Sequence, residues 1–130
     1  MVEHPDAAII RRGYEAFLKG DMPALDKLIT SDAVWHSPGK NPISGDYQGR
    51  DAIMEYFTKF ATLSQGTFQT ELKVIFADDN RGVVLTRDTA SRNGKTMSWD
   101  GGVILHLCEG KLTEAWAFNL DQYAVDEFWA

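Results

Sequence analysis

The first half of the chain repeats its apolar residues every three or four positions, which is the spacing of helices with one buried face. This pattern predicts a first helix that begins near Pro5 and ends at Gly20, because glycine commonly follows the last turn of a helix. Asp21 is expected to cap a short second helix, and residues 51–63 are expected to form a third. Between these two helices, residues 33–37 indicate a brief strand, and the glycines and prolines after it indicate a loop.

In the second half of the chain, β-forming residues alternate between two faces, which is the period of a strand. Four long strands are expected, over residues 67–77, 82–92, 95–108 and 111–120. Asn93 and Gly94 separate the second and third of these strands. This pair is typical of a two-residue hairpin turn, because both central positions of such a turn need a positive φ. Asp121 is expected to cap a final helical turn near the end of the chain.

Helices followed by an antiparallel meander predict an α+β fold, in a single domain over residues 1–130. Strands this long in so short a chain must twist and curl. A strongly curved, mainly antiparallel sheet with three N-terminal helices across its concave face forms a cone. The interior of such a cone is too wide for side chains to fill, so we expect one preformed apolar pocket for a small hydrophobic molecule.

Composition and charge narrow the classes of partner. The chain has 130 residues, a formal net charge of −6, and seven Phe, four Tyr and four Trp, an abundance of aromatic residues that fits a lined cavity or an apolar contact surface. The negative charge argues against nucleic acid or an anionic membrane as a partner. No apolar run approaches the roughly 18 residues that a membrane-spanning helix needs. The single Cys108 excludes an intramolecular disulfide and fits the reducing cytoplasm, where we expect the protein to reside.

Four segments carry a resemblance to a known family. They are GYEAFLKGD (13–21), DAVWHSPG (32–39), GDYQGRDAI (45–53) and EGKLTEAW (109–116). In this order and with these gaps, they resemble the SnoaL-like (polyketide cyclase-like) proteins of the nuclear transport factor 2-like (NTF2-like) superfamily. The resemblance implies the cone-shaped α+β fold that the pattern also predicts. Because the superfamily includes isomerases, cyclases, dehydratases, epoxide hydrolases and non-catalytic binding modules, the chemistry must be argued from the site.

A comparison with the ketosteroid isomerase-like members of this superfamily finds their catalytic positions changed. Those enzymes have an aspartate base where this chain has Ser37. Their oxyanion tyrosine corresponds to Gly13, with Tyr14 one residue out of register. Their second aspartate falls near Gly102 or Val103.

The limonene epoxide hydrolase-like pattern is also absent. It needs an arginine and an aspartate two positions apart on one strand, whereas Arg87 and Asp88 are adjacent and therefore point to opposite faces. Arg87 is expected either to clamp an anionic substrate or to pair with an acid on a neighbouring strand. Asp88 and Asp100 lie in mid-strand, where an unpaired buried carboxylate is costly, so each faces either a polar pocket or solvent.

Two residues are candidates for proton transfer. His36, at the expected mouth of the cone, titrates near neutral pH and could act as a general acid or base. The alternative is a histidine that is hydrogen-bonded at the end of a strand. SnoaL-like cyclases carry an acidic base near the end of the last strand, and the resemblance makes Asn119 and Asp121 its nearest equivalents here. The alternative role of Asp121 is the N-cap of the final helical turn.

The candidates for binding the small molecule are mostly aromatic: Tyr14, Trp35, Tyr56, Phe60, Trp99 and Trp116, together with Asn119. Aromatic side chains at these spacings can equally form an ordinary core. On the last strand, either the face of Trp116 or the face of Asn119 lines the pocket. If Trp116 lies on the convex face, an exposed apolar surface there needs a partner, and we expect a homodimer through the convex sheet face.

We expect neither a metal nor an organic cofactor. Three scattered histidines and one cysteine have no metal-ligand spacing, and no phosphate-binding glycine loop is present. Two functions therefore remain open. The first is a cofactor-free isomerase, cyclase or hydratase that acts by proton transfer on a small hydrophobic carbonyl compound. The second is a non-catalytic ligand-binding or dimerisation module.

Overall fold

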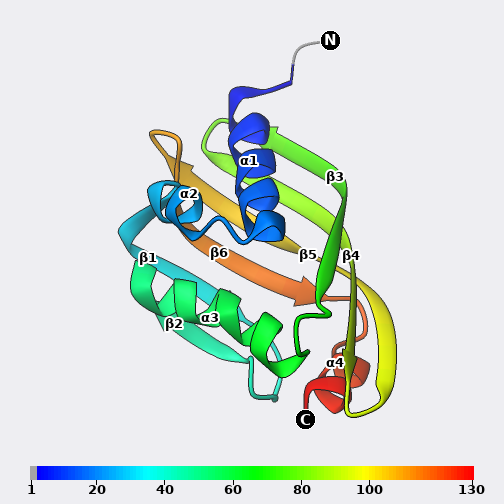
Figure 1. Cartoon of the computed structure of the whole chain (residues 1–130). Helices are drawn as coiled ribbons and strands as arrows, with labels where there is room; N and C mark the ends of the chain where they lie inside the picture. The colour runs from blue at the N-terminus through cyan, green and yellow to red at the C-terminus, as the bar shows by residue number, and fades with distance from the viewer. Residues whose placement is uncertain (1–2) are drawn as a thin grey trace.

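Six strands and four helices make up the computed structural model of the chain, which describes residues 3–130 (Figure 1). In chain order they are α1 (Pro5–Lys19), α2 (Met22–Lys27), β1 (Ile29–Ser37), β2 (Gly45–Gln48), α3 (Arg50–Leu63), β3 (Gln69–Asp78), β4 (Arg81–Arg92), β5 (Lys95–Cys108), β6 (Lys111–Asn119) and α4 (Gln122–Trp129). The predicted α+β class is confirmed, including three helices before the long strands. No helix within the described part of the chain is long and apolar enough to cross a membrane.

The strands form one curved sheet in the order β2-β1-β6-β5-β4-β3. All neighbouring pairs are antiparallel except β1 and β6, which run parallel. α1 packs against β3 and β4, whereas α3 packs against β1 and β2, so the helices cover one face of the sheet (Figure 1). Among the residues that the structure describes, no helix covers the opposite, convex face of β3, β4 and β5.

Local sequence signals set the ends of several elements as predicted. Gly20 ends α1 with a φ of 68°, in the left-handed region that glycine enters at little cost. The Asp21 and Asp121 carboxylates accept hydrogen bonds from backbone N–H groups in the first turns of α2 and α4. Asn93 and Gly94 join β4 to β5 with φ values of 53° and 78°, as a type I′ turn requires.

β2 is a strand that the sequence pattern did not predict, because it lies inside the expected loop. It is four residues long, largely exposed, and follows no apolar alternation. Its position comes from pairing with β1, where Tyr47 lies opposite Trp35. β1 also begins at Ile29, four residues before the predicted strand, since its first half pairs with β6 at Leu112. Both differences arise from contacts between distant segments rather than from local pattern.

An irregularity in β6 decides which of its side chains meet the helices. Leu112 lies opposite Leu107, but Glu114 lies opposite His106, so Thr113 is an extra residue in the β5–β6 pairing. Such a bulge reverses the alternation of faces along the strand. Residues on its two sides therefore do not follow a simple odd–even rule.

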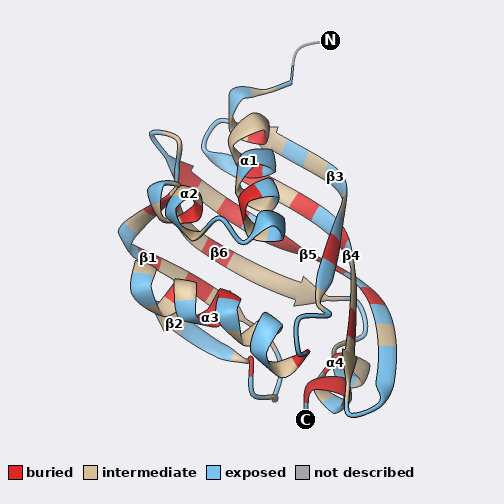
Figure 2. Cartoon of the chain, in the orientation of Figure 1, coloured by how far each residue is buried: buried red, intermediate tan, exposed pale blue. Residues whose placement is uncertain are grey.

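The core lies between the concave face and the helices, and α4 closes one end of it. Figure 2 shows buried positions alternating with exposed ones along β4 and β5, as expected for a sheet with one covered face. Phe128 and Trp129 of α4 are both buried and pack against Trp99 of β5. Phe60 and Phe68 complete the aromatic cluster at this end.

Candidate functional site

A cavity of about 160 Å³ lies between the concave face of the sheet and the helices. Its walls are largely aliphatic and aromatic side chains, which is usual for small-molecule sites. Six of the seven residues predicted to bind a small molecule border this cavity: Tyr14, Trp35, Tyr56, Phe60, Trp99 and Asn119. The cone therefore encloses space rather than a fully packed core.

Asp88 is the one carboxylate on the cavity wall among the described residues. It lies on β4 between Thr70 of β3 and Trp99 of β5, and all three side chains share the concave face. The Thr70 hydroxyl donates a hydrogen bond of 2.5 Å to the Asp88 carboxylate. Burial raises the pKa of Asp88 to about 6, although hydrogen bonds from Thr70 and Thr86 oppose part of this rise. At neutral pH the group is an ionised carboxylate with the basicity that proton abstraction needs.

Two tyrosines supply hydroxyl groups to the same cavity, Tyr14 from α1 and Tyr56 from α3. Burial raises the pKa of both phenols above the ordinary value, and the charge of Asp88 raises each further. Both therefore stay neutral at physiological pH and can donate hydrogen bonds. All three groups therefore border one apolar cavity.

His36 lies away from the cavity wall and is held between two carboxylates. Its Nδ1 is 2.7 Å from Asp46 of β2, and its Nε2 is 2.7 Å from Glu114 of β6. Its ring stacks on Trp116. Hydrogen bonds that His36 donates to the Glu114 and Asp46 carboxylates raise the pKa of His36, which favours the charged imidazolium. This geometry corresponds to the structural alternative, a hydrogen-bonded histidine on a strand.

Asp121 also lies outside the cavity lining. Its carboxylate caps α4 by accepting a hydrogen bond of 3.1 Å from the Ala124 N–H, and the side chain is exposed. The proton-transfer hypothesis required His36 or Asp121 to open into the enclosed space. Since neither residue does, neither is placed to exchange a proton with a molecule in the cavity.

Trp116 is the predicted binding residue that the structure places elsewhere. Its ring packs on His36 and His106, on the face of the sheet opposite the cavity. Ala117 and Asn119 of the same strand border the cavity instead. Of the two arrangements left open by the sequence, the small face of β6 therefore lines the pocket.

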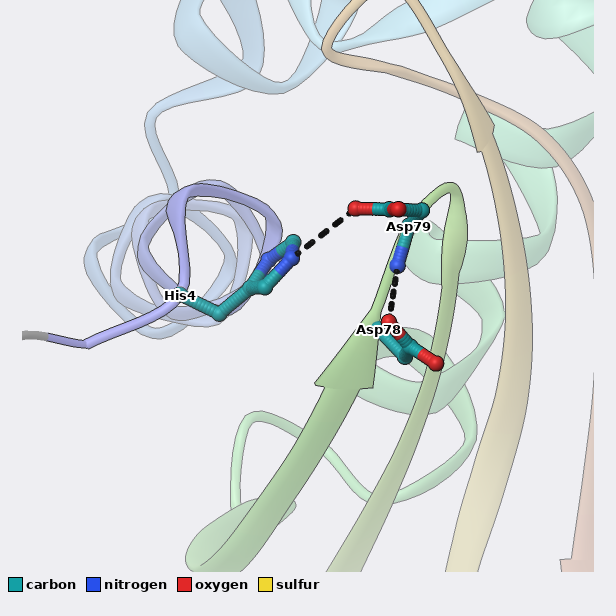
Figure 3. A group of neighbouring side chains, drawn as sticks. All are labelled: His4, Asp78 and Asp79. Atoms are coloured by element: carbon teal, nitrogen blue, oxygen red, sulfur yellow. Dashed lines mark hydrogen bonds and ion pairs between the residues drawn. The ribbon is translucent and has the colours of Figure 1, made fainter.

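His4, Asp78 and Asp79 bring three potential metal ligands together at the surface (Figure 3). His4 Nε2 is 3.4 Å from the Asp79 carboxylate, and His4 Nδ1 accepts a hydrogen bond from the Asp6 N–H. In a neutral ring this places the proton on Nε2, the nitrogen that faces Asp79. That nitrogen then donates a hydrogen bond instead of offering a lone pair. The cluster thus ties the start of α1 to the β3–β4 turn.

Residues 10–115, most of the chain, match the family model of the SnoaL-like domain. The chain belongs to the SnoaL-like family. The resemblance carried by the four sequence segments is thereby confirmed.

Several known proteins are similar to this SnoaL-like chain over nearly their whole length. Bal32a, from a soil-derived mobile gene cassette, is 36% identical with a TM-score of 0.93, and 97% of each chain is covered. A protein of unknown function with a cystatin-like fold from Xanthomonas campestris is 27% identical with a TM-score of 0.89, covering 96% of this chain and 98% of that one. The uncharacterized protein Rv0034 of Mycobacterium tuberculosis is 27% identical over 131 residues, 100% of both chains.

Sequence reasoning about this SnoaL-like protein left the position of Asp88 open and did not select it. The deciding fact is strand register, which places Asp88 opposite Thr70 and on the same face as Trp99. The alternation along β4 did carry a local signal. Asp88 shares a strand face with Thr86 and Ala90, which are buried, whereas the adjacent Arg87 is exposed on the other face. The same register pairs Arg87 with Asp100 through a 3.0 Å ion pair on the outer face, as one of the two readings of Arg87 expected.

Proposed function

We propose that this SnoaL-like protein binds a small hydrophobic carbonyl compound and catalyses cofactor-free proton transfer at the carbon beside the carbonyl. The observation that carries the proposal is Asp88, a carboxylate with a raised pKa in an apolar cavity that also holds two neutral tyrosines. Groups with perturbed pKa values in enclosed pockets are favoured candidates for catalysis.

In the proposed step, the Asp88 carboxylate takes a proton from the carbon next to the carbonyl. The C–H electron pair forms the C=C bond of an enolate, and the C=O π electrons move to oxygen. Tyr14, or Tyr56 with it, donates a hydrogen bond to that oxygen as its charge develops. Asp88, now protonated, returns the proton to the same or another carbon, so that atoms and charges balance without a redox partner. Returning it elsewhere on the conjugated system gives an isomerisation.

The size of the cavity limits the substrate. Its volume of about 160 Å³ is close to the roughly 150 Å³ of an engineered apolar cavity that holds benzene. A compound with one ring therefore fits without rearrangement of the walls. The apolar lining favours a ring with few polar substituents.

The competing function is a ligand-binding module without chemistry. It is favoured by Ser37 and Gly13, which stand where ketosteroid isomerase-like enzymes carry a base and an oxyanion tyrosine. Asp88 and Tyr14 supply the same two chemical groups from other positions of the cavity wall.

Exchange of methyl protons of acetophenone in D₂O, followed by NMR, distinguishes the two functions. The wild-type protein is expected to accelerate exchange, and Asp88→Asn to lower that rate by about 10²-fold or more, the usual contribution of a general base. Asp32→Asn is the matched control, since Asp32 is an exposed carboxylate on β1 that does not border the cavity. Binding of acetophenone without any accelerated exchange would support the module instead.

A further inference from the structure

The side-chain amide of Asn119 has a fixed orientation at the cavity wall, set by hydrogen bonds that lead to Asp126 on α4. Asn119 Nδ2 donates to Gln122 Oε1 at 3.0 Å, and Gln122 Nε2 donates to Asp126 Oδ1 at 2.9 Å. An ionised carboxylate can only accept, so Gln122 must turn its NH₂ group toward Asp126 and its oxygen toward Asn119. Asn119 must in turn direct an N–H toward Gln122, which leaves its Oδ1 on the other side.

Asp126 ends this chain of hydrogen bonds, and its carboxylate is held in place by further donors. The same Oδ1 atom accepts from the Asn41 side chain at 2.7 Å and from the Lys40 N–H at 3.0 Å. Burial alone would raise the pKa of Asp126, but the hydrogen bonds from Gln122, Asn41 and Lys40 together hold it below the ordinary value. Gly39 makes room for the arrangement, because a Cβ at this position would collide with Asp126 and Gln122.

Asn119 Oδ1 has no hydrogen-bond partner among residues 3–130 and lies over the backbone of Gly101 on the concave face. A Cβ on Gly101 would come within 3.0 Å of Asn119 Oδ1. Gly101 pairs with Asn119 on one side and with Thr86 on the other, so the three positions form one row across β6, β5 and β4. Thr86 borders the cavity two residues before Asp88. An acceptor on Asn119 and the basic carboxylate of Asp88 therefore face the same enclosed space.

We propose that Asn119 Oδ1 selects a ligand that carries a hydroxyl group in addition to its carbonyl, that is, a hydroxylated one-ring ketone. The proposal rests on the proposed function, because it assigns a second polar contact to the same ligand. A ligand without a donor leaves this acceptor unpaired in an apolar site, and such mismatches strongly reduce binding. Asp126 is then a positioning residue, which acts on selectivity only through Gln122 and Asn119.

The test compares binding of 3-hydroxyacetophenone with binding of acetophenone and 3-methoxyacetophenone, which lack the donor. The wild-type protein is expected to bind the hydroxylated ketone about tenfold more tightly, the value of one well-placed hydrogen bond. Asp126→Ala should reduce this ratio below about threefold. Asp126→Asn should restore it, because its Oδ1 can accept from the same donors. Glu127→Ala, an exposed carboxylate on the same helix, is the control that should keep the ratio.

Asn119→Leu provides a second variant that does not disturb the loop held by Asp126, and it too should lose the preference. Equal affinity of the wild type for the three ketones overturns the inference, as does an equal loss of all three affinities in Asp126→Ala. Asp88-dependent proton exchange without hydroxyl selectivity removes this inference and keeps the proposed function. Failure of every ketone to bind removes both.

Discussion

At the scale of single residues, the site depends on the carboxylate of Asp88, which lies in an apolar cavity where burial makes its negative charge energetically unfavourable. Asp88 has one short hydrogen bond from Thr70 and a second donor in Thr86, but no ion pair among the described residues. Its surroundings are otherwise the apolar wall of the cavity. Such an arrangement favours the protonated form, and it makes the ionised group a stronger base than an exposed aspartate.

Asp88→Asn is therefore expected to stabilise the protein at neutral pH. The pKa of Asp88 rises from 3.8 to about 6 on folding, so the folded state holds this proton more tightly and stability falls as pH rises through that window. An asparagine side chain does not ionise, so the variant does not lose stability over this pH range. Its free energy of unfolding should exceed that of the wild type by about 1–3 kcal/mol at pH 7.5 and by little at pH 4.

Urea unfolding of both proteins at the two pH values measures this difference. Asp32→Asn again serves as the control, because this carboxylate is exposed on β1 and does not border the cavity. A variant that is less stable than the wild type at pH 7.5 would show that Asp88 contributes favourable contacts, contrary to this account.

At the scale of elements, His36 links three strands at the edge of the sheet. It belongs to β1, and its two nitrogens contact carboxylates on β2 and on β6. β2 has only four residues, and the parallel β1–β6 pair joins segments that are far apart in sequence. The imidazolium, paired with both carboxylates, therefore stabilises the edge formed by β2, β1 and β6, where the local sequence pattern specifies strand pairing least.

His36→Gln is expected to lower stability in a pH-dependent way. The folded pKa of His36 is raised by Glu114 and Asp46, so its contribution is fully present below the ordinary value of 6.5 and is lost as pH rises through the raised value. The free energy of unfolding should fall by about 1 kcal/mol at pH 5.5, with a smaller loss at pH 9. His106→Gln, which removes the other ring on Trp116, is the control. An identical loss at both pH values would contradict an ionic role for His36.

Prediction from sequence succeeded where the signal is local and failed where it depends on register. The caps at Asp21 and Asp121, and the turn at Asn93-Gly94, need only neighbouring residues and were predicted correctly. β2 was missed because nothing in its four residues alternates. The face that each β6 side chain occupies depends on the bulge at Thr113, which no local pattern reveals.

The same limit applies to the site. The aromatic lining could be predicted because aromatic residues at helical and strand spacing must face a core or a cavity. Asp88 could not be chosen over Asp100 from the sequence, since both lie in mid-strand. Only the pairing with Thr70 and Trp99 shows that Asp88 faces inward. The orientation of Asn119 likewise depends on Asp126 of α4, because Gln122 links the two residues by hydrogen bonds.

At the scale of the whole molecule, an apolar band crosses the convex face of the sheet. Phe76, Val83, Ile104 and Trp116 lie opposite one another in successive strands β3, β4, β5 and β6. Phe76 and Ile104 are 59% and 41% exposed, and Leu85 beside them is 37% exposed. Contiguous exposed apolar surface of this kind is typical of an interface, and we propose that it joins two copies of the chain about a two-fold axis.

Sedimentation velocity at micromolar concentration tests the proposed dimer. The wild-type protein should sediment as a dimer. Ile104→Arg should sediment as a monomer, because the dimer interface would bury one unpaired arginine from each copy in apolar surroundings. Tyr123→Arg is the control, since Tyr123 is 91% exposed on α4 and lies off the sheet. A wild-type monomer would exclude the proposal.

The most direct test of the site is an NMR titration of the Asp88 side-chain carboxyl carbon. The expected midpoint lies near pH 6, since burial in the cavity raises the pKa of this group to about 6. Asp88→Asn identifies the signal by its loss. A midpoint near the ordinary aspartate value of 3.8 would mean that water solvates the carboxylate, and that the cavity does not hold the base on which the proposed chemistry depends.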